Sequence, residues 1–299
     1  MIQTAVLILG AAGGFGQLLT RLLTDAGYRV SGVDTRFPTA APAERLAACV
    51  VFDASAPPIG SLAGLVSAAD WIVSCMPPEP TLRAFANLSP FMKAGSMFMD
   101  VLSVKGPICR VMAKGRSDIE CLSVHPMFAP RTGFANQNVA VVRVRPGVAT
   151  AAAEALIASW DARVHVLTAE EHDARTAMVQ AATHAAILSF GITLMSMGYR
   201  AEDVLPLSTP PHRILMALLA RITSGNPYVY QQIQTENPLS ASARTAITAA
   251  AMRFDRIAAT DDGADFTELF QSLRSMLDNC TESLFLLADD LVSTSARSL

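Results

Sequence analysis

The feature that most constrains the fold is a glycine-rich segment near the start of the chain. The run from Gly10 to Gly16 (GAAGGFG) follows an apolar stretch, residues 5–9, and precedes leucines at helical spacing. Glycine lets the backbone turn tightly and approach a ligand closely, and the N-terminus of the next helix offers N–H groups to an anion. A strand that ends in such a turn is typical of doubly wound α/β proteins.

Short apolar runs alternate with helical patterns through the first half of the chain. Continuous apolar runs, as opposed to alternating ones, are typical of strands covered on both faces. They predict an α/β fold with a mostly parallel, doubly wound sheet, a Rossmann-type domain over residues 1–167. The predicted strands are residues 5–9, 28–33, 49–52, 71–75, 97–99, 138–144 and 163–167. Proline-bearing loops are expected at residues 39–43 and 77–80.

The pattern changes near residue 168. From there to residue 299, alanine, leucine and methionine recur at helical spacing, which predicts an all-helical C-terminal domain. Loops are expected at residues 203–211, 225–227 and 261–264. The apolar content exceeds what one small domain needs for its own core, so we expect this domain to form a homodimer interface.

Composition excludes several classes of protein. The 299 residues carry 23 Lys+Arg against 26 Asp+Glu, a net charge of −3, so there is no basic field for nucleic acid. No uninterrupted apolar run reaches about 18 residues, which argues against a membrane span. The chain starts without a secretory signal, and its five cysteines are odd in number and widely spaced. These features predict a cytoplasmic protein with reduced thiols and no metal site.

The glycine run and its surroundings predict a dinucleotide site. We expect the backbone around Gly10, Gly13, Gly14, Phe15 and Gly16 to hold a pyrophosphate, although a tight turn without a ligand is the alternative.

Three further residues extend this site. Asp34 ends the second predicted strand; a carboxylate there accepts hydrogen bonds from the ribose hydroxyls and repels a 2′-phosphate, so NAD is the expected cofactor. Arg36 keeps NADP as an alternative. Cys75 and Met76 follow the fourth predicted strand, at the edge where such cofactors lie.

Several segments carry more polar residues than segments that only pack a core. Together with the glycine run, and in this order, they resemble the prephenate dehydrogenase family over nearly the whole chain. The combination of "SVK" and "HPMF" is the most specific part of the resemblance. The segments are residues 100–107 (DVLSVKGP), 124–130 (VHPMFAP), 171–173 (EHD), 208–213 (STPPHR), Arg221 and 226–230 (NPYVY).

The resemblance implies an NAD-linked oxidative decarboxylation of a cyclohexadiene dicarboxylate. The first expectation is conversion of prephenate to 4-hydroxyphenylpyruvate in tyrosine biosynthesis. Arogenate and 4-amino-4-deoxyprephenate, the latter in secondary metabolism, are alternative substrates. Three alternatives lie outside this reaction: a 3-hydroxyacid dehydrogenase, an imine reductase and a non-catalytic NAD-sensing dimer.

The resemblance also implies roles for single residues. His125 is expected to accept the proton of the 4-hydroxyl, since imidazole can accept a hydrogen bond at neutral pH. Ser103 is expected to contact the nicotinamide region and the substrate hydroxyl, with a helix N-cap as the alternative. Arg221 matches the arginine that grips the ring carboxylate. His172 and Asp173 are expected to cap and orient the helix between the domains.

Four further residues are weaker candidates for substrate binding. Lys105 either adds positive potential or is an ordinary solvated lysine. His184 matches a histidine near the side-chain carboxylate of the substrate. Arg213 is expected to make a structural ion pair. Tyr230 either reaches the pocket or packs inside the helical domain.

Overall fold

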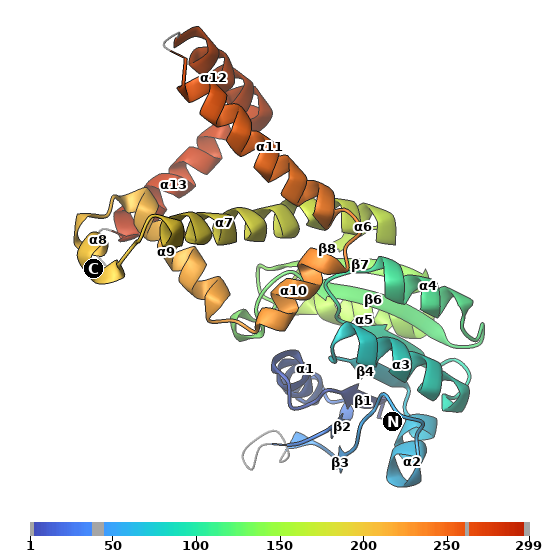
Figure 1. Cartoon of the computed structure of the whole chain (residues 1–299). Coiled ribbons are helices and arrows are strands. Elements are labelled where there is room, and N and C mark those ends of the chain that lie inside the picture. The colour runs from blue at the N-terminus through green and yellow to red at the C-terminus, as the bar shows by residue number, and fades with distance from the viewer. Residues whose placement is uncertain (1–2, 38–44, 261–262, 296–299) are drawn as a thin grey trace. The chain divides into compact units, whose positions relative to one another are not determined.

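The computed structural model describes residues 3–37, 45–260 and 263–295, and it divides into two compact units (Figure 1). The first unit is Met1–Asp173 and the second is Ala174–Leu299. The division falls a few residues after the predicted boundary at residue 167. The loop predicted at residues 39–43 lies outside the described residues.

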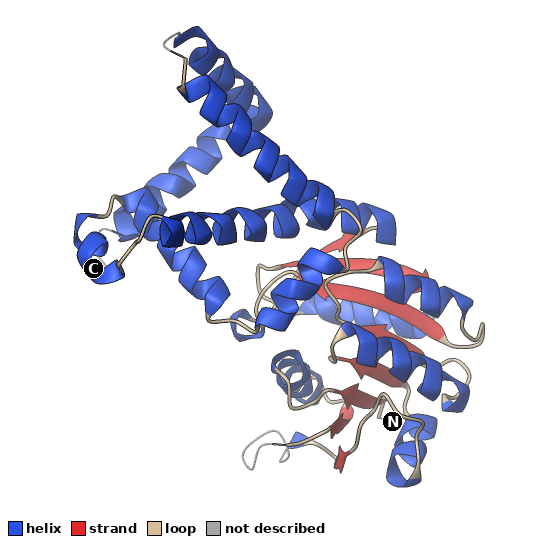
Figure 2. Cartoon of the chain, viewed as in Figure 1, coloured by secondary structure: helices blue, strands red, loops and turns tan. Residues whose placement is uncertain are grey.

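The first unit is built on one eight-stranded sheet, drawn in red in Figure 2, with strand order β3-β2-β1-β4-β5-β6-β7-β8. All neighbouring strands are parallel except the antiparallel pair β6 and β7. The predicted doubly wound, mostly parallel sheet is therefore confirmed. The strands are β1 Ala5–Leu9, β2 Arg29–Asp34, β3 Ala48–Val51, β4 Trp71–Ser74, β5 Met97–Asp100, β6 Glu120–Pro126, β7 Asn138–Arg145 and β8 Arg163–Val166.

Strand β6, which contains His125, was not among the predicted strands. His125 is the last residue but one of β6. The apolar pattern did not reveal this strand because Ser123 and His125 interrupt it, yet both are buried. A similar correction applies to residues 77–80, since Pro78 begins a helix; proline is well suited to a first helical turn.

Helices cover both faces of the sheet. Along β1, Val6 and Ile8 pack into one apolar core, and Leu7 and Leu9 pack into another on the opposite face, as the alternation of a strand requires. The first core includes α1 Gly14–Asp25 and α5 Val148–Ser159. The second core includes α2 Gly60–Ala68, α3 Pro78–Leu88 and α4 Gly106–Lys114.

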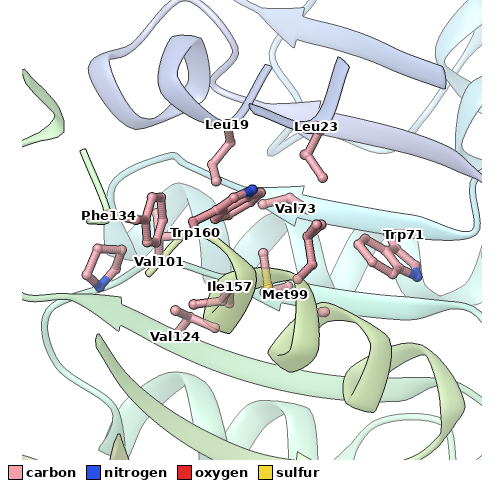
Figure 3. Close-up of a pocket in the computed structure, with 13 residues that line it drawn as sticks. Leu19, Leu23, Trp71, Val73, Met99, Val101, Val124, Phe134, Ile157 and Trp160 are labelled. Carbon is pink, nitrogen blue, oxygen red and sulfur yellow. The ribbon is translucent and has the colours of Figure 1, made fainter. Parts of the chain in front are cut away.

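A small cavity remains in the first of these cores (Figure 3). It lies among Leu19 and Leu23 of α1, Ile157 of α5, and sheet residues such as Val73 and Val124. Its volume of about 20 Å³ is close to that of one water-sized probe, and its lining is apolar and aromatic. A dicarboxylate would neither fit nor find a polar partner there, so this cavity is a packing space.

The second unit is helical throughout its described residues. Its helices are α7 Thr183–Ser196, α8 Ala201–Val204, α9 Pro210–Thr223, α10 Pro227–Thr235, α11 Ser240–Ala258, α12 Gly263–Leu277 and α13 Thr281–Ser295. The loop predicted at residues 225–227 is confirmed for its first two residues, whereas Pro227 begins α10. The loop predicted at 203–211 is partly wrong, because α8 and a 3₁₀ turn, Leu205–Leu207, occupy much of it. Of the loop predicted at 261–264, the first two residues lie outside the described chain and Gly263 begins α12.

One continuous helix runs from α6 Ala169–Thr176 through a π-helical turn, Ala177–Ala182, into α7. Over Ala169–Ser196, 28 residues, it is long and apolar enough to cross a membrane by length and composition, and 17% of its most apolar window is buried. The sequence expectation missed it because scattered threonine, serine and histidine residues break every apolar run. An apolar helix that is this exposed in a single chain is also expected where a second subunit covers it.

Candidate active site

The carboxyl ends of five parallel strands bring the predicted site residues of the first unit to one edge. Strands β1, β2, β4, β5 and β6 run parallel through successive pairs. Residues at or just beyond their ends are Gly10, Asp34, Cys75, Ser103 and His125. In open α/β sheets, ligands bind outside this edge.

The glycine loop has the close backbone packing that only glycine permits. Gly10 has a φ of +77°, and a Cβ atom there would lie 3.0 Å from the carbonyl carbon of Cys75 and 3.1 Å from Cγ of Met76. A Cβ atom on Gly16 would lie 2.1 Å from the carbonyl oxygen of Gly10. Because glycine has no Cβ atom, the first turn of α1 can pack this closely against the ends of β1 and β4.

The N-terminus of α1 fits an anionic group. Gly13 is its N-cap, no side chain in the described residues caps it, and its first turn has no acidic residue. Gly13 and Gly14 are exposed, so their backbone is open to a ligand. Free N–H groups at a helix N-terminus bind phosphate well.

Asp34 and Phe15 complete the surroundings of this loop. The Asp34 carboxylate accepts a hydrogen bond from the backbone N–H of Ala12 at 2.9 Å, which holds it beside the glycine run. The Phe15 ring contacts the Phe128 ring with their centroids 5.9 Å apart. The residues present therefore fit a dinucleotide, with a carboxylate at the end of β2 beside the glycine loop.

His125 belongs to a buried chain of hydrogen bonds. Its Nδ1 lies 2.9 Å from Nε2 of His172, and Nδ1 of His172 lies 2.8 Å from Oδ1 of Asp173. All three side chains are buried, and all three belong to the first unit. An imidazole with its partner ordered in this way can accept a proton at a defined position.

His172 and Asp173 do not cap helix α6, which corrects their expected role. Thr168 and Glu171 do so instead: the Glu171 carboxylate accepts from the Thr168 N–H at 2.9 Å, and Thr168 Oγ1 accepts from the Glu171 N–H at 3.1 Å. This is a capping box. His172 instead contacts His125, and Asp173 contacts His172. The adjacent histidine and aspartate were the only sign of this hydrogen-bond chain in the sequence.

The surroundings shift the pKa values of all three groups. Burial, followed by the ammonium of Lys105 and the neighbouring His172, holds the pKa of His125 well below its usual value of 6.5. Burial also lowers the pKa of His172, and Asp173 only partly offsets this. Burial opposes ionisation of Asp173, but hydrogen bonds from His172, Lys105 and Gly106 outweigh it and lower the pKa. At neutral pH the two imidazoles are therefore neutral and the carboxylate is charged.

Lys105 is fully buried, so the alternative of a solvated lysine is wrong. Its ammonium donates to Oδ1 of Asp100 at 3.0 Å and to the carbonyl oxygen of Val124 at 2.7 Å. Val124 directly precedes His125 in β6, and the ammonium of Lys105 lowers the pKa of His125. Asp100, which the sequence analysis did not single out, also accepts from the Leu102 N–H at 2.9 Å.

Ser103 lies between β5 and α4 and is partly exposed. The N-cap of α4 is Lys105, so the alternative role of Ser103 as a helix cap is wrong. Its hydroxyl group lies on the segment that links Asp100 to α4, at the same edge of the sheet as His125. The predicted contact of Ser103 with cofactor and substrate remains a prediction.

The other predicted residues belong to the second unit. The rings of His184 on α7 and Tyr230 on α10 make an edge contact, with centroids 5.0 Å apart and an interplanar angle of 71°. Arg221 is exposed in the last turn of α9. Among the described residues, Arg213 donates to Ser208 Oγ at 2.9 Å and to the Ser295 carbonyl oxygen at 3.5 Å, so its predicted ion pair is not seen there.

Comparison with known proteins identifies the family. Residues 19–185 match the family model for the nucleotide-binding domain of prephenate dehydrogenase, and residues 168–272 match the model for its dimerization domain. A 4-amino-4-deoxyprephenate dehydrogenase from Streptomyces pristinaespiralis is 34% identical over 270 residues, which cover 90% of each chain. The chain belongs to the prephenate dehydrogenase family. The first match begins after the glycine loop, which therefore adds its own support.

Other members of the prephenate dehydrogenase family agree with this. The T-protein of Enterobacter agglomerans is 28% identical over 231 residues, which are 76% of this chain and 55% of that protein. A prephenate dehydrogenase from A. aeolicus, solved with hydroxyphenyl propionate and NAD+, has a TM-score of 0.67 at 16% identity and covers 93% of this chain and 99% of its own. The Synechocystis arogenate dehydrogenase has a TM-score of 0.67 at 16% identity and covers 94% of this chain and 100% of its own. These two structures share the fold.

The family settles the class of enzyme. The expected NAD-dependent dehydrogenase, with a nucleotide-binding domain followed by a helical dimerization domain, is confirmed. The chain is an oxidoreductase of the prephenate dehydrogenase type.

Proposed function

We propose that this enzyme carries out the oxidative decarboxylation of a cyclohexadiene dicarboxylate, with His125 as the proton acceptor. The observation that carries the proposal is the buried, neutral imidazole of His125 at the carboxyl edge of the sheet, hydrogen-bonded through His172 to Asp173. An unprotonated imidazole is needed to take a proton during turnover.

The reaction requires a proton to leave and return. NAD, held by the glycine loop and Asp34, would supply the acceptor for the hydride that leaves C4 of the ring. As the C4–H bond breaks, His125 takes the proton from the oxygen or nitrogen on C4, and a C=O or C=N bond forms there. The C1–carboxylate bond then breaks, CO2 leaves, and its electron pair makes the ring aromatic. His125 returns its proton to the C4 substituent, so no net proton is consumed.

We propose 4-amino-4-deoxyprephenate as the first candidate substrate, in aminophenylalanine-type secondary metabolism. Its support is the 34% identity, over 90% of both chains, to an enzyme named for that substrate. Prephenate, which the sequence analysis placed first, is the second candidate and is favoured by the family itself. Arogenate is the third.

Further residues are proposed to hold the substrate and the cofactor. Arg221 would bind the ring carboxylate, because a guanidinium pairs with a carboxylate through two hydrogen bonds. His184, with Tyr230 against its ring, would bind the side-chain carboxylate. Ser103 would contact the C4 substituent, since a hydroxyl group both donates and accepts. The glycine loop and Asp34 would hold NAD.

The test is an assay of the purified chain with all three substrates, each with NAD and with NADP. Formation of the reduced nucleotide and release of CO2 are measured in the same reactions. We expect equal amounts of both with NAD and the highest kcat/KM for 4-amino-4-deoxyprephenate. NAD binding without turnover of any of the three would contradict the proposal and support a non-catalytic sensor. Reduced nucleotide without CO2 would point to the chemistry of a hydroxyacid dehydrogenase or an imine reductase.

We also propose that the enzyme is a cytoplasmic homodimer formed through the helical unit. Neither α12 nor α13, as described, has a buried side chain. Exposed large apolar side chains cluster on α11, α12 and α13, namely Met252, Phe254, Phe266, Phe270, Leu273, Met276, Leu284, Phe285, Leu286, Leu287 and Leu291. So much exposed apolar surface indicates an interface with another chain or with a membrane. Light scattering should give twice the chain mass without detergent, whereas sedimentation with membranes would contradict the proposal.

A further inference from the structure

We propose that His172, oriented by Asp173, is a positioning residue that fixes the tautomer of His125 and so leaves Nε2 of His125 as the proton-accepting atom. The functional consequence rests on the proposed function, but the tautomer itself does not.

The protons of this chain can be assigned in order. The Asp173 carboxylate carries no proton, so in the 2.8 Å contact the N–H of His172 Nδ1 donates to Oδ1. His172 is neutral, because burial lowers its pKa, and its second nitrogen, Nε2, therefore has a lone pair. In the 2.9 Å contact with that lone pair, Nδ1 of His125 must be the donor. A neutral His125 that is protonated on Nδ1 has its lone pair on Nε2.

The groups around His125 favour this state. Lys105 and His172 are among the groups that act on it, and burial together with the Lys105 ammonium disfavours protonation of the ring. Asp100 pairs with Lys105, and Asp173 pairs with His172, so each stands one contact away. When Nε2 takes a proton, the positive charge can spread towards the Asp173 carboxylate through Nδ1 and His172. His172 therefore favours the tautomer of His125 that is protonated on Nδ1.

Asp173 also links this chain to the segment that carries Ser103. Its Oδ1 accepts from the backbone N–H of Lys105 and its Oδ2 accepts from the N–H of Gly106, both at 2.9 Å. A Cβ atom on Gly106 would lie 3.0 Å from Oδ2, so glycine permits the approach. One carboxylate therefore orients His172 and holds the start of α4, close after Ser103 in the chain.

The direct test is nitrogen NMR of the full-length chain with ¹⁵N-labelled histidine. The chain has five histidines, and the His125 signals are assigned from their loss in His125→Asn. We expect a protonated Nδ1 and an unprotonated Nε2 in the wild type. In His172→Phe we expect a mixture of tautomers, and in His172→Gln, whose amide oxygen can still accept from Nδ1–H, we expect the wild-type pattern. His165→Phe is the control, since His165 is exposed on β8 and its ring bonds the side chain of Asn138, away from His125 in the sequence. A protonated Nε2 in the wild type, or an unchanged pattern in His172→Phe, would overturn the proposal.

A second test separates positioning from a structural role. We expect kcat to fall about 100-fold in His172→Phe and to be close to the wild-type value in His172→Gln. In His165→Phe we expect kcat to stay unchanged. All three variants should still bind NAD. Equal losses in both His172 variants with an unchanged tautomer would overturn the proposal. Asp173→Ala gives an independent check if His172→Phe does not fold, since it removes the acceptor of His172 and should also produce mixed tautomers. If the wild type turns over none of the three substrates, the proposed function fails while the NMR result still decides this inference.

Discussion

Nδ1 of His125 and Nε2 of His172 lie 2.9 Å apart, although 47 residues separate them in the sequence. His125 is the last residue but one of strand β6 and His172 lies in the first turn of α6, and both rings are buried. A buried imidazole pair is costly unless each ring has a partner, and the Asp173 carboxylate supplies the partner for the second ring. The arrangement places a buried imidazole where parallel strands of a nucleotide-binding domain end.

The first prediction concerns His125 itself. His125→Asn removes the proton acceptor but keeps a polar side chain of similar reach. We expect kcat to fall by about 10²-fold or more and the Kd for NAD to stay within a factor of about 2, because NAD binding rests on the glycine loop. Steady-state kinetics and calorimetric titration measure the two quantities. The exposed His165→Asn is the matched control, and near-normal turnover by His125→Asn would remove the assignment.

The second prediction concerns pH. Burial and Lys105 lower the pKa of His125 below 6.5, so its Nε2 stays unprotonated through neutral pH. We expect kcat/KM to be flat from pH 8 down to about 6.5 and to fall only at lower pH, as His125 becomes protonated. A decline centred at or above pH 7 would show that another group controls the reaction.

The third prediction is the matching dependence of stability on pH. His125 and His172 both have lowered pKa values in the folded chain, so the unfolded chain binds more protons as the pH drops below 6.5. The free energy of unfolding should be constant above that pH and should decrease below it. Urea denaturation at a series of pH values measures this. The double variant His125→Asn/His172→Gln should show a shallower decrease, and an identical slope would contradict the assignment.

The fourth prediction concerns the buried pair of Lys105 and Asp100, both fully buried. Lys105→Met leaves the carboxylate buried without its cation, which should lower the free energy of unfolding by about 3–5 kcal/mol. The double variant Lys105→Met/Asp100→Asn should recover much of the loss. The partly exposed pair of Lys93 and Asp70 is the control, since Lys93→Met should cost about 1 kcal/mol or less. Equal effects of the two lysine variants would contradict the burial argument.

The fifth prediction concerns the glycine loop. A Cβ atom at Gly16 would overlap the carbonyl oxygen of Gly10, so Gly16→Ala must displace the first turn of α1. We expect NAD affinity to fall at least about tenfold, which is about 1.4 kcal/mol, together with a lower Tm. Gly64→Ala on α2 is the control, because nothing lies within 4 Å of a Cβ atom there. Unchanged NAD affinity in Gly16→Ala would place the cofactor elsewhere.

The sequence by itself determined the fold class, the order of the two units, the glycine loop and the identity of His125 as the principal candidate. These follow from local patterns, because the periodicity of apolar residues and the conformation of glycine depend on near neighbours in the chain. Only the tertiary structure decided that His125 lies in a strand, that Lys105 is buried against Asp100, and that His172 and Asp173 face His125 and do not cap α6. Those facts depend on which strands and helices pack together, and contacts between residues far apart in the sequence leave no periodic trace in it.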